Sequence, residues 1–141
     1  MSNISIHNEN AFFQMRKAGE LDSIQQVVTR AAKLADKGDL NKDFISASEV
    51  VNSELFEKSS EFGMLKILDT LEPIVLSSDK DRYIKLVDGL RAGSKALAAF
   101  FDGQDSVMVM VDDIDVRRNR LNLLGVLRNQ ASILADFNRI K

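Results

Sequence analysis

The chain has 141 residues, a formal net charge of −2, 45% hydrophobic residues and 28% charged residues. This length is enough for one domain with its own hydrophobic core, and this composition differs from that of an intrinsically disordered chain. Cysteine is absent, which excludes a disulfide, a thiolate nucleophile and a cysteine-bound metal. We expect a single domain over residues 1–141, in which residues 1–9 form a loose N-terminal segment.

The N-terminal stretch lacks a basic leader followed by a sustained apolar region. The chain also has no uncharged apolar stretch of the ~20 residues that a membrane-spanning helix needs. We therefore expect a soluble, cytoplasmic protein without membrane contact. The single histidine, His7, lies in the expected loose segment, which argues against a nucleophile–histidine pair or a histidine metal site. We predict no cofactor and no metal.

The first apolar pattern predicts helix over residues 10–37, either as one element or as two collinear pieces. Apolar residues recur there at steps of three and four, as they do on the buried face of an amphipathic helix. Gly38 follows the last turn, and glycine readily adopts the left-handed conformation that ends many helices. We expect the helix to stop there.

A second apolar stretch predicts a helix that begins near Ser46 and ends before Pro73. Ser46 and Glu49 have the spacing of a capping box, and the pattern breaks or weakens around residues 59–63. Pro73 is the only proline of the chain. Because its ring clashes with the preceding turn, we expect the helix to end near residues 71–72.

A third helix is predicted over residues 79–101, where apolar side chains again recur at helical spacing. Gly89 and Gly93 lie inside it, and each costs roughly 1 kcal/mol relative to alanine. Either these glycines let a neighbouring helix approach closely, for which we favour the C-terminal helix, or they have no structural role. Asp102 and Gly103 should end the helix.

The stretch from Val116 to Lys141 predicts one long C-terminal helix, because it contains no proline and one glycine. Its apolar residues cover more than one narrow face. The helix should therefore contact other elements on two sides, either as the centre of a bundle or as half of an interface between chains.

The start of this last helix is ambiguous. Residues 107–111 are wholly apolar and rich in valine, which is also typical of a buried strand. Because nothing else in the chain resembles a strand, we favour a helix that begins at Asp105 or Ser106, with Asp112 as the alternative start. The prediction is an all-α fold, a single-domain bundle of four or five helices with a long C-terminal helix.

Basic residues gather in the C-terminal stretch. Residues 116–141 hold six basic residues and one acidic residue, whereas the rest of the chain holds 13 basic and 20 acidic residues. Guanidinium groups bind phosphates and carboxylates in a bidentate manner, but the pI near 5.4 and the lack of a nucleic-acid-binding motif favour pairing with acids of the same chain. The candidate contacts to an anionic partner are Arg117, Arg118, Arg120 and Arg128.

Aromatic pairs and the apolar face of the last helix are candidate contacts to another molecule. Adjacent helical residues point about 100° apart, so one narrow face cannot bury both members of a pair. Either these helices are buried broadly, or one aromatic residue of each pair contacts a partner. The candidate interface residues are Phe12, Phe13, Phe100, Phe101, Leu123, Leu127, Leu134 and Phe137.

These features predict a non-enzymatic helical protein for interaction or assembly, such as an adaptor, an inhibitor or a structural subunit. It would use the apolar, arginine-rich last helix to bind a protein partner or a second copy of itself. One alternative is a nucleic-acid-associated protein whose C-terminal arginines contact phosphates, with binding that weakens steeply as salt rises. Another is an enzyme that works with carboxylates, for which only generic residues argue.

Overall fold

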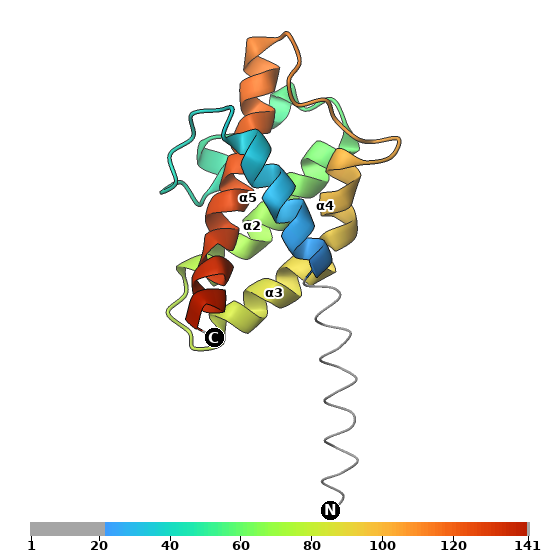
Figure 1. Cartoon of the computed structure of the whole chain (residues 1–141). Helices are drawn as coiled ribbons and strands as arrows, with labels where there is room; N and C mark the ends of the chain where they lie inside the picture. The colour runs from blue at the N-terminus through green and yellow to red at the C-terminus, as the bar shows by residue number, and fades with distance from the viewer. Residues whose placement is uncertain (1–21, 141) are drawn as a thin grey trace, which may run out of the picture.

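The computed structural model describes residues 22–140, with side chains up to Leu134. Residues 22–35 form the first described helix, drawn in blue in Figure 1, which buries Ile24, Ala31 and Ala35 and leaves its other side exposed. Within this part of the chain there is no strand, so the predicted all-α fold with a long C-terminal helix is confirmed. In chain order, the other elements are the 3-10 turns η1 (Ala47–Glu49) and η2 (Ser53–Leu55) and the helices α2 (Ser59–Leu76), α3 (Arg82–Ala92), α4 (Ser94–Phe101) and α5 (Ile114–Ile140).

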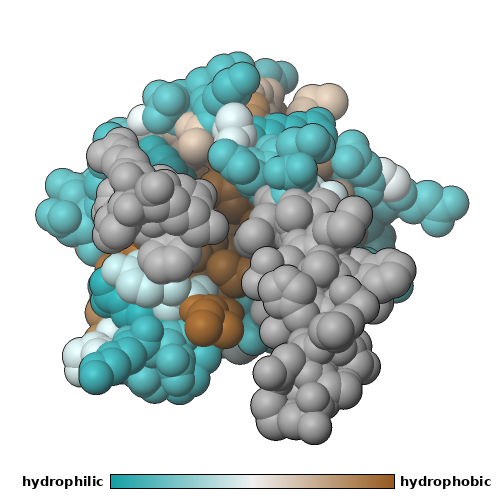
Figure 2. All heavy atoms as spheres, turned by 60° about the horizontal axis from the view of Figure 1, so that its bottom comes forward, coloured by the Kyte–Doolittle hydropathy of each residue, from teal (hydrophilic) through white to brown (hydrophobic). Residues whose placement is uncertain are grey.

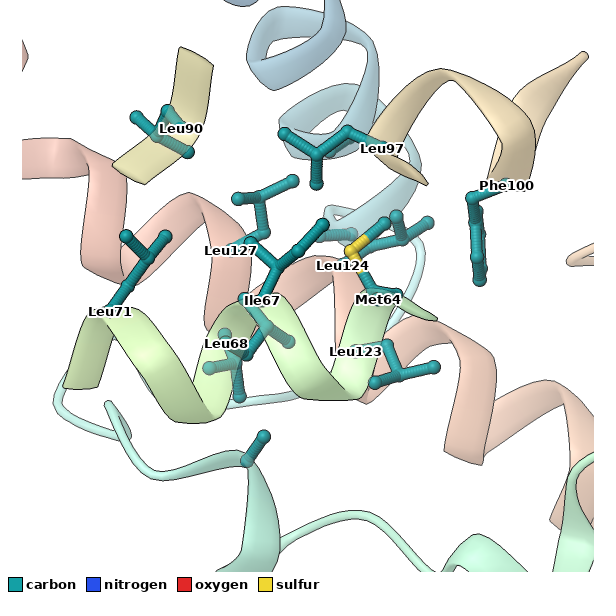
Figure 3. Packing of buried hydrophobic residues seen from close by; sticks show 14 of the residues in the cluster. Met64, Ile67, Leu68, Leu71, Leu90, Leu97, Phe100, Leu123, Leu124 and Leu127 are labelled. Atoms are coloured by element: carbon teal, nitrogen blue, oxygen red, sulfur yellow. The ribbon is translucent and has the colours of Figure 1, made fainter. Parts of the chain in front are cut away.

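The core lies where α2 meets α3, α4 and α5. Figure 3 shows side chains of α2 pointing among leucines of α3, α4 and α5. Each fully buried leucine or phenylalanine contributes about 1.5–3 kcal/mol relative to an exposed one. The core side chains without exposed surface include Met64, Leu68, Leu71, Leu90, Leu97, Phe100, Leu123, Leu124 and Leu127.

The long helix α5 is buried around most of its circumference between Asn119 and Ala131. It contacts α2 and α3 as well as the turns η1 and η2. The chain also approaches it closely at Leu40, since a Cβ placed on Gly125 would lie 2.8 Å from Leu40 Cδ2. The prediction that this helix touches neighbours on two sides is confirmed, and these neighbours belong to its own chain.

The predicted boundary at Pro73 is wrong, because α2 continues through Pro73 to Leu76. A proline inside a helix leaves the carbonyl four residues earlier, here that of Asp69, without its hydrogen bond. Asp69 and Pro73 are both exposed, so water can bind this carbonyl. Val75 in the last turn is 5% exposed, and its burial offsets part of the cost of the proline.

The predicted helix from Ser46 is also wrong, because residues 46–58 form only the short turns η1 and η2. The Ser46 side chain makes no capping hydrogen bond. The helix begins at Ser59 instead, where the Glu61 carboxylate accepts the backbone N–H of Lys58 at 3.0 Å. An acidic side chain is favoured there because the first turn of a helix presents free N–H groups.

The predicted helix over residues 79–101 is divided into α3 and α4, which meet at Gly93. The expectation that the C-terminal helix approaches its glycines is wrong, because the close neighbour is α2. A Cβ on Gly93 would lie 2.9 Å from Ile67 Cδ1, and a Cβ on Gly89 would lie 2.5 Å from Leu71 Cδ2. The two glycines therefore allow α2 and α3 to pack closely.

Replacing Gly93 with alanine should lower the free energy of unfolding by about 1–3 kcal/mol, because the new methyl group overpacks the contact with Ile67. Gly63→Ala is the matched control, since its Cβ would lie 3.7 Å from Ala96 Cβ, an ordinary contact distance. Inside α2 this change should raise stability by up to about 1 kcal/mol. Urea denaturation of both variants measures the difference. Equal effects of the two changes would contradict the close packing at Gly93.

The first helix ends at residue 35, near its predicted end, and the predicted start at residue 10 lies outside the described residues. Gly38 does not adopt the predicted left-handed conformation. Among the described residues, Gly103 has the positive φ, at 97°, in the turn after α4. Gly38 serves close packing instead, since its Cβ would lie 3.2 Å from Leu121 Cβ of α5.

Residues 107–111 form neither of the two structures considered for them. They make an irregular segment with bends at residues 109 and 110, and α5 begins later, at Ile114. Asp113 Oδ1 accepts the N–H groups of Asp115 and Val116 at 3.0 and 3.2 Å. This N-cap fixes the start of α5, two residues after the alternative start at Asp112 and well after the favoured one.

The described surface is largely polar. Figure 2, which brings the bottom of Figure 1 forward, shows mostly hydrophilic residues on the described part of this face, with a hydrophobic area near its middle. None of the helices described over residues 22–140 combines the length and apolar character that crossing a membrane requires.

Candidate functional site

A buried ion pair joins the second turn of α5 to the first turn of α2. Arg120 of α5 is 3% exposed and Glu61 of α2 is 0% exposed. Arg120 Nε and Nη2 donate to the two carboxylate oxygens of Glu61 at 3.3 and 3.2 Å, and Nη2 also donates to Glu57 Oε1 at 2.8 Å. Since each buried charge has its counter-charge and its hydrogen bonds, neither is left unpaired in the core.

The same two side chains also bind three backbone groups. Glu61 Oε1 accepts the N–H groups of Glu57 and Lys58 at 2.9 and 3.0 Å. Arg120 Nη1 donates to the carbonyl of Met108 at 2.7 Å. The ion pair therefore connects α5 both to the residues before α2 and to the segment that joins α4 to α5.

Four amide side chains of α5 bind the irregular segment of residues 36–58. Asn119 binds both backbone groups of Asn52, accepting its N–H at 2.7 Å and donating to its carbonyl at 2.9 Å. Buried backbone groups need such partners, and here a helix supplies them from its side chains. The other bonds run from Asn122 to the carbonyl of Val50 (2.8 Å), from Asn129 to those of Asn41 (3.0 Å) and Phe44 (2.7 Å), and from Gln130 to that of Ile45 (2.8 Å).

We did not single out Asn119, Asn122, Asn129 or Gln130 in the sequence. Three of the four are nevertheless buried. The sequence did contain a sign that some of these amides would be buried. The apolar residues of this helix cover so much of its circumference that neighbouring elements also had to pack against part of its polar side.

A shallow depression of about 500 Å³ lies beside this site, between η1, η2 and the first turns of α5. Its lining mixes acidic, basic, amide and apolar side chains, so it favours no single class of ligand. No group of three or more potential metal ligands occurs among the residues that the structure describes. The lining residues are Glu49, Val50, Val51, Asn52, Leu55, Asp115, Arg118, Asn119 and Asn122.

The four candidate arginines point to separate partners within the chain. Arg117 Nη1 donates to the carbonyl of Val111 at 3.4 Å, and Arg128 Nη2 donates to that of Leu40 at 3.0 Å. Arg118, whose side chain is 66% exposed, pairs with Asp39 at 3.1 Å. With Arg120 bound inside the core, the structure does not bring the four guanidinium groups together on one surface.

The candidate interface residues are also dispersed. Phe100, Leu123 and Leu127 are fully buried in the core, and Leu134 is partly buried against it. Phe101 is half-buried, with its ring 5.4 Å from that of Phe100 and 4.7 Å from the guanidinium carbon of Arg30. The candidates Phe12 and Phe13 and the side chain of Phe137 lie outside the described residues.

Curated proteins that match nearly the whole chain are named glycine–tRNA ligase beta subunits. The chain is 42% identical to the one from Gloeothece citriformis over 139 residues, 48% identical to the one from Acaryochloris marina over 127 residues and 44% identical to the one from Picosynechococcus sp. over 142 residues. The matches cover 97%, 89% and 97% of this chain. The chain is similar to part of a tRNA ligase subunit.

The chain spans about a fifth of the length of these relatives, since the matches cover 19%, 18% and 20% of them. No family model matches the chain, and no solved structure matches it.

The prediction of a non-enzymatic interaction protein is therefore wrong, because the relatives are named as subunits of a ligase. The error has a physical reason. The lack of cysteine and the single histidine limit the chemistry that these 141 residues can perform. The relatives are about five times as long, so these residues do not decide whether the relatives are enzymes. The broad apolar surface of α5, which suggested a partner, is covered by the chain's own elements.

Proposed function

We propose that this chain is a helical module of a glycine–tRNA ligase beta subunit and takes part in joining glycine to tRNA. The observation that carries the proposal is 42–48% identity to subunits of that name over 89–97% of the chain. The match leaves about four fifths of the relative uncovered. The partner of the module is then this remaining part of the subunit.

The internal contacts support a module that keeps its shape. Irregular segments are attached to α5 by the ion pair of Arg120 and Glu61 and by hydrogen bonds from the amide side chains of α5. A body held in this way can place its outer surface against the rest of a ligase without first being ordered, which lowers the entropy lost on assembly.

A segment exchange tests the proposal. The stretch of the Acaryochloris marina beta subunit that matches this chain is replaced by this chain, and the attachment of glycine to tRNA by the complete ligase is measured. We expect the rate to stay within about tenfold of the unmodified ligase, a change of at most ~1.4 kcal/mol in transition-state free energy.

Two control ligases accompany the exchange. One lacks the matched stretch, and the other carries the exchanged segment with Leu127→Asp, which places a charge in the fully buried core. Both should lose more than about a hundredfold in rate, or ~2.7 kcal/mol. An exchanged ligase that folds and assembles but is as inactive as the deletion would refute the proposed function.

A further inference from the structure

The segment that joins α4 to α5 and the first residue of α5 expose apolar side chains. Met108, Met110 and Ile114 expose 72%, 42% and 67% of their surface, whereas Val109 exposes 7%. Val109 therefore faces the core, while the methionines on either side of it face outward. We call Met108, Met110 and Ile114 the methionine strip; Figure 1 shows its segment as the orange loop at the upper right.

The backbone below the strip is fixed. Arg120 Nη1 donates to the carbonyl of Met108 at 2.7 Å, and Ser60 Oγ of α2 donates to the carbonyl of Asp105. The apolar side chains are therefore held outward by contacts to α2 and α5. An ordered apolar surface loses little conformational entropy when a partner covers it, and the flexible thioether side chains of methionine adapt to the partner's shape.

The charge around the strip is mainly negative. Two arginines also lie beside it: Arg120, which is buried, and Arg117, whose Nη1 donates to the carbonyl of Val111 at 3.4 Å. Residues 102–115 contain five aspartates and neither lysine nor arginine. Asp102 pairs with Arg30 of the same chain at 3.4 Å. The exposed aspartates that remain beside the strip are Asp105, Asp112, Asp113 and Asp115.

This charge selects the kind of partner. Two copies of the chain that met through their strips in a symmetric contact would bring these aspartates against each other, and like charges across an interface are strongly unfavourable. A segment with lysine or arginine beside apolar residues complements the strip in both charge and hydrophobicity.

We propose that the methionine strip is the docking surface for a basic, apolar segment of the remaining part of the ligase beta subunit. This inference rests on the proposed function. The part of a beta subunit that lies outside the matched stretch is about four times as long as this chain, and it supplies the occupant.

Oxidation of the methionines tests the docking surface. The isolated chain and the complete ligase with the exchanged segment are treated with hydrogen peroxide, and the sulfoxide at each methionine is followed by mass spectrometry. Because oxidation follows exposure, Met108 and Met110 should react at least about tenfold more slowly in the ligase than in the isolated chain. Met64, which is fully buried, is the internal control and should react slowly in both.

Charge variants test the basic character of the partner. Asp112→Asn with Asp113→Asn removes two charges, and asparagine at 113 can still cap α5. This pair should speed the oxidation of Met108 in the ligase, and Asp39→Asn with Asp43→Asn, two exposed aspartates elsewhere on the chain, should not. Carbodiimide cross-linking of the exchanged ligase without these charge changes should join Asp112 or Asp113 to a lysine of the same subunit outside the exchanged stretch.

Equal oxidation of Met108 and Met110 in the isolated chain and in the ligase would overturn the inference. So would cross-links from these aspartates only to a second copy of the module. An exchanged ligase that attaches glycine normally but leaves the strip unprotected refutes the docking surface and leaves the proposed function standing. An inactive ligase with a protected strip refutes the proposed function alone.

Discussion

Replacing Arg120 with methionine is expected to lower the free energy of unfolding by about 3–5 kcal/mol, because the carboxylate of Glu61 stays buried without its counter-charge. Glu61 has no exposed surface, and Arg120 lies 3.2 Å from it. The change also removes the donor that binds the carbonyl of Met108. Urea denaturation followed by circular dichroism measures the loss.

Two comparisons isolate the buried charge as the cause. Arg118→Met removes an arginine from the same helix, but the Arg118–Asp39 pair is exposed on both sides, so we expect a loss below about 1 kcal/mol. Adding Glu61→Gln to Arg120→Met should restore part of the stability, because no buried charge is then left unpaired. Similar losses for Arg118→Met and Arg120→Met would show that the ion pair contributes little.

Leu127→Ala should lower the free energy of unfolding by about 2–5 kcal/mol, because it leaves a cavity in the core between α2 and α5. Leu127 has no exposed surface in the described structure. Thermal and urea denaturation of the variant measure the loss, and light scattering shows whether the mass of the folded chain changes with it.

Ile84→Ala is the matched control, since Ile84 of α3 is 58% exposed. It should change stability by less than about 0.5 kcal/mol. A loss below about 1 kcal/mol for Leu127→Ala would mean that its side chain is not packed as described, since large-to-small changes at buried leucines cost more than this.

The helical class and the position of α5 could be predicted from the sequence because both depend on local spacing. Apolar residues at steps of three and four, without a proline, suffice to predict α5. The boundaries failed where tertiary contacts outweigh a local rule. Pro73 was expected to end a helix, but burial of Val75 favours one more turn. At residues 46–58 a helix was expected, but amide side chains of α5 bind backbone groups of this segment and stabilise a non-helical conformation.

The buried ion pair could not be found in the sequence for a similar reason. The basic residues of the C-terminal stretch were conspicuous in the sequence, and pairing with acids of the same chain was the favoured explanation. However, Arg120 pairs with Glu61, a residue 59 positions earlier. Sequence spacing predicts contacts within a helix, whereas the choice of Arg120 over Arg118 as the buried arginine depends on which side of α5 faces α2.

The attachment of residues 36–58 to α5 has a consequence for how the protein is made. The hydrogen bonds that hold this early segment join residues 67 to 88 positions apart. Since a ribosome synthesises the chain from its N-terminus, residues 36–58 are made before the side chains that bind them exist. This segment therefore reaches its final shape only after the last helix has been translated, and nascent chains that end before Asn119 should be cleaved there by proteases.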